Sequence, residues 1–292
     1  MSMFLTFDIE DWYHANYSEV RPPAAGNLHS NFPKNVQRLM EICARLHIRS
    51  TCFVLGEMGE KFPEVIRALH AAGHEIASHG YAHKLVYSMT PTEFKEDLGR
   101  SCGILEDITG RKILGFRAPS WSVKRENLGW YYETLESLGL RYSSSVYPAH
   151  TFLYGIEDFP EQAGYPEIAG RRTTILEIPV PVTRVLHRKV GYSGGFYLRF
   201  FPAFFIKQRL DRALAAGAKP FIYLHPREID VDQPKLKLSL LNHTIHYWGI
   251  RSCERKLEHI LAGYADRIQT MESFISPGLP NSRGNGTHAR MD

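Results

Sequence analysis

Residues 3–14, MFLTFDIEDWYH, run from an apolar segment directly into three acidic side chains, Asp8, Glu10 and Asp11. Aspartate and glutamate are poor strand formers, and like charges this close repel one another unless a positive group lies among them. The apolar residues predict a buried strand. The acids that follow predict a positive group, from a metal ion or a basic side chain, at the end of that strand.

Strand-like and helix-like segments alternate along the rest of the chain. Strands are predicted at 3–7, 50–55, 74–78, 112–116, 174–180, 219–224 and 267–271, and helices at 32–46, 63–73, 90–110, 124–139, 202–217 and 238–261. This alternation with short connections is typical of an α/β fold, in which helices cover a parallel sheet. We expect one domain over residues 1–275 and a disordered tail over residues 276–292.

Composition excludes some classes of function. The 292 residues carry a net charge of +4 and contain no basic run, so we expect no nucleic-acid partner. The four cysteines are far apart, which favours free thiols in a reducing compartment. The sequence has neither a signal-peptide pattern nor a membrane-length apolar run, so a cytoplasmic protein is expected. The aromatic segment 194–210 predicts a buried helix entry, with peripheral membrane contact as the alternative.

Polar residues follow four of the predicted strands at the point where each strand ends. The three acids follow the first strand, His79 and His83 the strand at 74–78, Arg117 and Trp121 the strand at 112–116, and His225 the strand at 219–224. The carboxyl ends of parallel strands meet at one face of a sheet or barrel, where such folds place their active sites. These residues therefore predict one shared site.

The residue types at these strand ends indicate metal-assisted hydrolysis. His79 and His83 share a face if residues 78–83, SHGYAH, begin a helical turn, and two imidazoles plus one carboxylate leave positions for water and substrate on a metal. Asp8 is the candidate base, kept ionised by a bidentate ion pair with Arg117. His225 is the candidate general acid for the leaving group. This set predicts hydrolysis of a carbonyl compound.

The ordered motifs TFDIED, SHGYAH, GFRAPSW and YLHP resemble the NodB-homology polysaccharide deacetylases, carbohydrate esterase family 4, over roughly residues 1–270. The stretches DIEDWYH, GYSGGFYLRFFP and HPREIDVDQPKLKL resemble a subgroup associated with bacterial exopolysaccharide and surface-glycan loci. The resemblance implies a distorted (β/α)₇ TIM-like barrel and one divalent metal ion, usually Zn²⁺ and sometimes Co²⁺ or Ni²⁺. It also implies removal of acetyl groups from N-acetylated hexosamines.

The resemblance also implies roles for individual residues. By its motifs, Asp8 is the catalytic base and Arg117 orients it, His79 and His83 bind the metal, and His225 protonates the leaving amine. Trp121 lines the pocket, and a backbone N–H near Ser120 stabilises the oxyanion. Trp12 stands directly before the irregular stretch 13–30, and its flat ring is expected either to stack on a sugar or to make ordinary packing contacts.

The sequence departs from the family pattern at two positions. Ile9 stands where the family has a second acid, so the metal carboxylate comes from Glu10 or Asp11. Glu10 is favoured because it points to the same side of a strand as Asp8, while Asp11 remains open as ligand, support or loop cap. Ser143 stands where the family has an aspartate that supports the arginine and histidine. Either this support is weaker, or Asp158 or Glu177 replaces it.

We therefore expect a metal-dependent hydrolase that removes N-acetyl groups from a glycan or sugar precursor carried on a nucleotide, a lipid or a polymer. Another carbon–nitrogen hydrolase on the same scaffold, such as a deformylase or a cyclic amidase, is the alternative. A non-catalytic glycan-binding relative is a third possibility. The residues favour no particular sugar, carrier or oligomeric state.

Overall fold

The computed structural model describes residues 2–15, 30–151 and 154–275. Its main sheet has eight strands, and every strand pairing in it is parallel. The order is β11-β1-β2-β3-β4-β5-β8, and β12 pairs with the start of β1. The strands are β1 (Met3–Ile9), β2 (Thr51–Val54), β3 (Glu75–Ser78), β4 (Gly115–Phe116), β5 (Tyr142–Ser143), β8 (Leu176–Glu177), β11 (Phe221–Leu224) and β12 (Ile268–Gln269).

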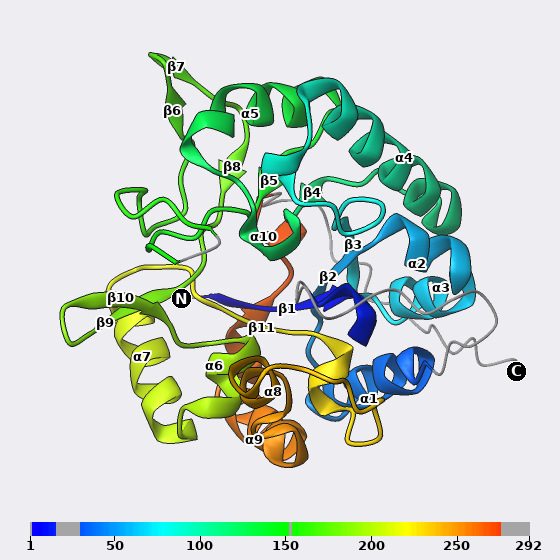
Figure 1. Cartoon of the computed structure of the whole chain (residues 1–292), viewed down its shortest axis with the longest axis vertical. Helices are drawn as coiled ribbons and strands as arrows, with labels where there is room; N and C mark the ends of the chain where they lie inside the picture. Colours follow the sequence, from blue (N-terminus) through cyan, green and yellow to red (C-terminus); the bar gives the residue numbers. More distant parts are fainter. Residues whose placement is uncertain (1, 16–29, 152–153, 276–292) are drawn as a thin grey trace, which may run out of the picture.

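Helices lie around the outside of this curved sheet, except for the last, whose Met271 and Phe274 pack against the inner cluster (Figure 1). They are α1 (Phe32–Arg45), α2 (Gly56–Lys61), α3 (Pro63–Ala71), α4 (Pro91–Thr109), α5 (Leu128–Ser137), α6 (Gly195–Phe200), α7 (Ala203–Ala215), α8 (Leu240–Tyr247), α9 (Ile250–Ala262) and α10 (Met271–Ile275). Within the described residues no ladder joins β8 to β11, so the barrel stays open on that side. The predicted α/β barrel is confirmed, in a distorted, open form.

Strand β1 divides the core into two parts by its alternation. Its odd-numbered side chains, from Met3 to Ile9, belong to the apolar cluster between sheet and helices. Phe4 belongs to the second cluster, with Phe53, Tyr142 and Phe221. Successive side chains on a strand point to opposite faces, so Asp8 lies on the face of Phe4, away from Ile9. Burying Ile9 among the helices therefore turns Asp8 towards the inside of the barrel.

Short elements complete the fold. Two antiparallel hairpins are formed by β6 (Glu167–Ile168) with β7 (Arg171–Arg172), and by β9 (Val182–Val185) with β10 (Arg188–Gly191). Single 3₁₀ turns lie just beyond three strands: η1 (Trp12–His14) after β1, η3 (Pro119–Trp121) after β4 and η5 (Pro226–Ile229) after β11. These turns hold residues at the carboxyl edge of the sheet.

Two predictions for the C-terminal half are corrected by the structure. The single helix expected over 238–261 is wrong, because the left-handed Gly249 (φ 74°) separates α8 from α9. The aromatic segment 194–210 is only partly buried, since Phe201 and Phe205 pack against the core while Phe200 and Phe204 are 51% and 75% exposed. No helix in the described ranges is long and apolar enough to cross a membrane. The predicted tail, 276–292, lies outside the described residues.

Candidate active site

Glu10, His79 and His83 come together beyond the carboxyl ends of β1 and β3. Each offers one ligand atom, and these atoms all lie within 4.8 Å of one another. Glu10 and His79 are almost completely buried, with 2% and 1% of their surface exposed. The structure thus gathers the two predicted histidine ligands with Glu10 rather than with Asp11.

His79 is oriented by a single hydrogen bond. Its Nδ1 donates to the carbonyl oxygen of Arg117 at 2.8 Å, which leaves Nε2 as the nitrogen available to a metal. Burial lowers the pKa of His79 to about 4, against the opposing charge of Asp8. The imidazole is therefore neutral near pH 7, which is the form that binds metals.

His83 reaches the same space by a different conformation from the predicted one. Residues 78–83 form no helical turn: Gly80 has φ 79° and His83 itself has φ 55°. A non-glycine residue in the left-handed region is uncommon and is held there by its surroundings. The expected helical turn is wrong, yet the bend places the rings of His79 and His83 with centroids 5.4 Å apart.

The electrostatics of Glu10 fit a divalent cation. Its Oε2 lies 2.8 Å from Nε2 of His83, but within the described residues this buried oxygen has no hydrogen-bond partner. Burial raises the pKa of Glu10, but the charges of His83, His225 and Arg227 outweigh it and hold the pKa well below its usual range. A buried, ionised carboxylate beside two imidazoles is a donor set for Zn²⁺, and equally for Co²⁺ or Ni²⁺.

Asp11 lies outside this group. One of its oxygens accepts a hydrogen bond from the backbone N–H of Trp12 at 2.7 Å, and the other accepts from the hydroxyl of Ser30. Asp11 is thus the N-cap of η1, and its backbone N–H in turn donates to His14. Of the three open roles for Asp11, the structure supports the loop cap.

Asp8 and Arg117 form a buried ion pair next to the histidines. Nη1 of Arg117 lies 2.6 Å from Oδ1 of Asp8 and 2.9 Å from Oγ1 of Thr6, and Nη2 donates to Oγ of Ser144 at 3.1 Å. The guanidinium lies 4.0 Å from the ring centroid of Phe53. The pair is made through one nitrogen, so the predicted bidentate geometry is wrong. The other hydrogen bonds of Arg117, to Thr6 and Ser144, fix the position of its guanidinium.

His225 faces Asp8 and Glu10 from β11. Its Nε2 lies 3.7 Å from Oδ2 of Asp8 and 3.6 Å from Oε1 of Glu10, and its Nδ1 lies 3.2 Å from Oε2 of Glu228. Burial lowers the pKa of His225, but Glu10 and Glu228 outweigh it, so the pKa is raised. Arg199 lies 3.2 Å from Glu228 on the other side.

Sequence reasoning missed Glu228 and Arg199. A signal for Glu228 was present, because in HPRE it stands three residues after His225, the spacing of a capping box, and its carboxylate accepts the backbone N–H of His225 at 3.1 Å. Arg199 gave no local signal, since it comes from α6, far away in the sequence.

Ser143 supports neither Arg117 nor His225 through any described contact. Its hydroxyl is bonded to Tyr131 at 2.8 Å and to Ser145 at 3.0 Å. Glu177 instead accepts the backbone N–H groups of Ser145 and Val146, at 2.7 and 2.9 Å. The exposed Asp158 pairs with Arg125. The expectation that Asp158 or Glu177 replaces the missing aspartate is therefore wrong: Ser144 contacts the arginine and Glu228 the histidine.

The predicted sugar-contacting residues fall into two places. Trp121 is buried against Tyr223, with ring centroids 4.6 Å apart, and lies 5.8 Å from the guanidinium of Arg117. Ser120 shares its turn, and both residues are left-handed, at φ 51° and 47°. Trp12 lies in η1 beside Asp11, packed edge-on against Tyr13. Trp121 and Ser120 thus adjoin the Asp8–Arg117 pair, and Trp12 lies beyond the first strand.

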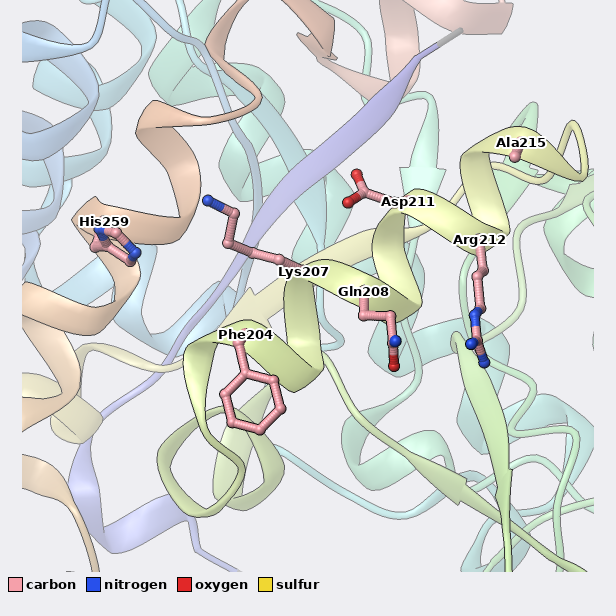
Figure 2. Close-up of a pocket in the computed structure, with 7 residues that line it drawn as sticks. All are labelled: Phe204, Lys207, Gln208, Asp211, Arg212, Ala215 and His259. Carbon is pink, nitrogen blue, oxygen red and sulfur yellow. The ribbon is translucent and has the colours of Figure 1, made fainter.

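Two cavities lie outside this cluster. A groove of about 600 Å³ runs along α7 and is lined by Phe204, Lys207, Gln208, Asp211, Arg212, Ala215 and, from α9, His259 (Figure 2). It contains none of the strand-end residues. A second cavity, of about 410 Å³, includes Tyr154, whose ring centroid is 6.2 Å from that of Trp121. Tyr154 is thus the lining residue that links the second cavity to Trp121.

Comparison with known proteins divides the chain near its middle. Residues 2–142 match the family model for polysaccharide deacetylases, and residues 144–274 match a model described as a domain of unknown function, DUF3473. A peptidoglycan deacetylase of Helicobacter pylori is 33% identical over 86 residues, which cover 30% of this chain and 29% of that protein. The peptidoglycan deacetylase-like protein FGM2 of Gibberella zeae is 29% identical over 157 residues, 49% of this chain and 45% of that protein.

The chain thus spans less than half the length of these curated relatives. Among solved structures, one from Mycobacterium smegmatis assigned to the polysaccharide deacetylases superposes with a TM-score of 0.65 at 19% identity, covering 94% of this chain and 88% of that one. That likeness extends over both matched regions and shows that the two chains share a distorted barrel fold. By family model and by relatives, residues 2–142 are thus similar to the polysaccharide deacetylases.

Proposed function

We propose that this chain is a metal-dependent carbohydrate N-deacetylase, a hydrolase that removes acetyl groups from N-acetylhexosamine units. One observation carries the proposal: Glu10, His79 and His83 lie within ligand distance of one another, and Glu10 lies beside His225, which also faces the Asp8–Arg117 pair. The match of residues 2–142 to the family model for polysaccharide deacetylases supports it. So do relatives named as peptidoglycan deacetylases, each matched over part of its length.

Asp8 is the proposed base. A divalent ion bound by Glu10, His79 and His83 would polarise the acetyl carbonyl and lower the pKa of the attacking water. Oδ1 of Asp8 is held by Arg117, so Oδ2, which faces His225 across 3.7 Å, is the oxygen that takes the proton from that water. The buried ion pair with Arg117 fixes the position of this carboxylate.

His225 is the proposed acid. Its Nε2 points into the same space, and its Nδ1 is occupied by Glu228. A proton on Nε2 can therefore pass to the leaving nitrogen, which is a poor leaving group until it is protonated. Acid and base thus lie within 3.7 Å of each other, next to Glu10 of the ligand group.

The proposal extends to the sugar contacts, the oxyanion donor, the metal ion, the substrate and its location. Trp121 and Trp12 are proposed to stack on sugar rings, and a backbone N–H at Ser120 to stabilise the oxyanion. Zn²⁺ is the proposed ion, and an exopolysaccharide or surface-glycan precursor the proposed substrate, in the cytoplasm. If its carrier is a lipid, peripheral membrane contact follows, for which the exposed Phe200 and Phe204 are available.

An acetate-release screen tests this proposal. The purified chain, loaded with Zn²⁺, is offered nucleotide-linked, lipid-linked and polymeric N-acetylhexosamines, and acetate and formate are measured side by side. The proposal expects acetate from at least one class, and a release about 10²–10⁴-fold slower from the Asp8→Asn variant. Formate without acetate would favour the deformylase alternative. No release from any class, with metal bound, would favour a non-catalytic glycan-binding relative.

A further inference from the structure

A second buried ion pair lies behind His225. Glu228, in η5, is 2% exposed, and its Oε2 accepts hydrogen bonds from the backbone N–H of His225 at 3.1 Å and from Nδ1 of its ring at 3.2 Å. Oε1 of the same carboxylate accepts from Nε of Arg199 at 3.2 Å. Glu228 therefore joins His225 to a cation on helix α6.

Arg199 is itself fixed by main-chain carbonyls. Its Nη2 donates to the carbonyl of Ile245 at 2.8 Å, and its Nη1 donates to that of Trp248, both at the C-terminal end of α8. The last carbonyls of a helix lack partners within the helix and carry partial negative charge, so a guanidinium is a favourable partner. Every nitrogen of this buried guanidinium thus has an acceptor, the condition under which a buried ion pair is not costly.

Helix α6 is placed directly against the strand that carries His225. Gly194, just before α6, packs so closely on β11 that an added Cβ would lie 2.1 Å from the ring of Tyr223. The backbone N–H of Tyr223 donates to the carbonyl of Ser193 at 3.3 Å. Strand β11 in turn pairs with β1, which ends in Asp8. Direct contacts therefore connect α8 with Asp8, through α6, β11 and β1.

We infer that residues 144–274, which match the model of a domain of unknown function, form the acid side of the active site, with Arg199 and Glu228 as positioning residues for His225. The inference rests on the proposed function. Glu228 holds the Nδ1 proton of His225, which turns Nε2 towards Asp8 and Glu10, and Arg199 holds Glu228. This pair takes the place of the support that Ser143, bonded to Tyr131 and Ser145, does not give.

The contrasting interpretation is that the Arg199–Glu228 ion pair only stabilises the packing of the helices. Lys256 of α9 provides a matched control, because it also binds main-chain carbonyls in this cluster, those of Leu198, Arg199 and Phe201 at 3.2, 2.7 and 3.0 Å. It has no described contact with Glu228 or His225. A variant at Lys256 therefore loosens the same helices without removing a partner of the histidine ring.

Leaving-group dependence separates the two interpretations. Departure of an amine from an N-acetylated sugar needs a proton, whereas departure of nitrophenolate from 4-nitrophenyl acetate does not. Glu228→Gln and Arg199→Lys should lower kcat for acetate release from the sugar about 10- to 100-fold, the range for partners of functional histidines. KM, the bound metal and kcat on the nitrophenyl ester should change little. Lys256→Gln should leave the ratio of the two kcat values unchanged.

An equal loss on both substrates, or the same change of ratio in Lys256→Gln, would overturn the inference. If the variants do not fold, ¹⁵N NMR of wild-type protein decides, with the His225 signal assigned from His225→Gln. The inference expects a proton on Nδ1 of His225, and an unprotonated Nδ1 overturns it. The NMR measurement needs no turnover, so its result is independent of the proposed function. The inference fails if Nδ1 is unprotonated even when the wild type releases acetate. The proposed function fails if the wild type releases no acetate even when Nδ1 is protonated.

Discussion

Glu10 and Glu75 are both buried, at opposite ends of the parallel sheet, and their pKa values move in opposite directions. Glu10 follows the carboxyl end of β1, and its pKa is held well below the usual range. Burial alone would raise that pKa, but His83, His225 and Arg227 place positive charge around the carboxylate. A low pKa keeps Glu10 ionised, the state that a metal ligand needs.

Glu75 is the first residue of β3, at the amino end of the sheet. Its oxygens accept from the hydroxyls of Thr51 and Tyr142, both at 2.6 Å, and from the backbone N–H of Glu272 at 2.9 Å. These donors are neutral, and burial raises the pKa of Glu75 to about 7. Burial is similar for both glutamates, so their partners decide the difference: cations gather at the carboxyl end, and neutral donors at the amino end.

The largest expected effect is at Glu10. Glu10→Gln removes the only carboxylate of the ligand group, so the variant should lose its bound divalent ion, and acetate release with it. Elemental analysis after gel filtration measures the ion. Asp11→Asn is the matched control, since Asp11 caps η1 and should leave metal content unchanged. The reverse result, with metal lost in Asp11→Asn alone, would remove Glu10 from the site.

Asp8→Asn should keep the ion and lose turnover. The amide cannot take a proton from water, and a general base contributes about 10²–10⁴-fold to rate, so kcat for acetate release should fall by that factor. Metal content and the circular dichroism spectrum should match those of the wild type. Turnover at the wild-type rate would place the base elsewhere and break the contrast between the two ends of the sheet.

Glu75 should change stability and its pH dependence, not chemistry. Its pKa is raised on folding, so between pH 4.5 and about 7 the unfolded chain binds fewer protons than the folded one. The contribution of Glu75 to stability is therefore complete below this window and falls as pH rises through it, by on the order of 3 kcal/mol. Glu75→Gln cannot ionise and should remove that decrease.

Urea unfolding at pH 5 and pH 8 measures the effect at Glu75. The stability difference between the two pH values should shrink in Glu75→Gln relative to wild type and remain in Glu64→Gln, a change at an exposed glutamate of α3. An unchanged difference in Glu75→Gln would mean that Glu75 is ionised at little cost in the folded protein. The contrast with Glu10 would then be lost.

The smallest expected effect is at Ser143. Ser143→Ala removes hydrogen bonds to Tyr131 and Ser145, at a cost of about 1 kcal/mol of stability, and should leave kcat unchanged. Ser144→Ala removes the hydroxyl that accepts a hydrogen bond from Nη2 of Arg117. It should therefore lower kcat more than Ser143→Ala does. A larger activity loss in Ser143→Ala would mean that Ser143 takes part in the support that we assign to Glu228.

Periodicity and strand ends predicted much of the architecture. The apolar run before Asp8 became the central strand, and the residues after β1, β3, β4 and β11 met at one edge, because parallel strands place their carboxyl ends together. Strand alternation also predicted the direction of individual side chains: Ile9 points towards the helices, and Asp8 therefore points into the barrel. The conformation of His83 was not predictable, because a left-handed residue is imposed by surroundings that a local pattern does not contain.

The sequence by itself determined which residue types stand at the end of each strand: three acids, two histidines, an arginine and a further histidine, in an order that resembles one family. Tertiary structure alone decided the position and the contacts of each of these residues. It put Glu10 rather than Asp11 beside the histidines, gave Arg117 one bond to Asp8, and brought Arg199 from α6 to Glu228. These outcomes depend on contacts between segments far apart in the chain, and such contacts form only when the sheet closes and its helices pack.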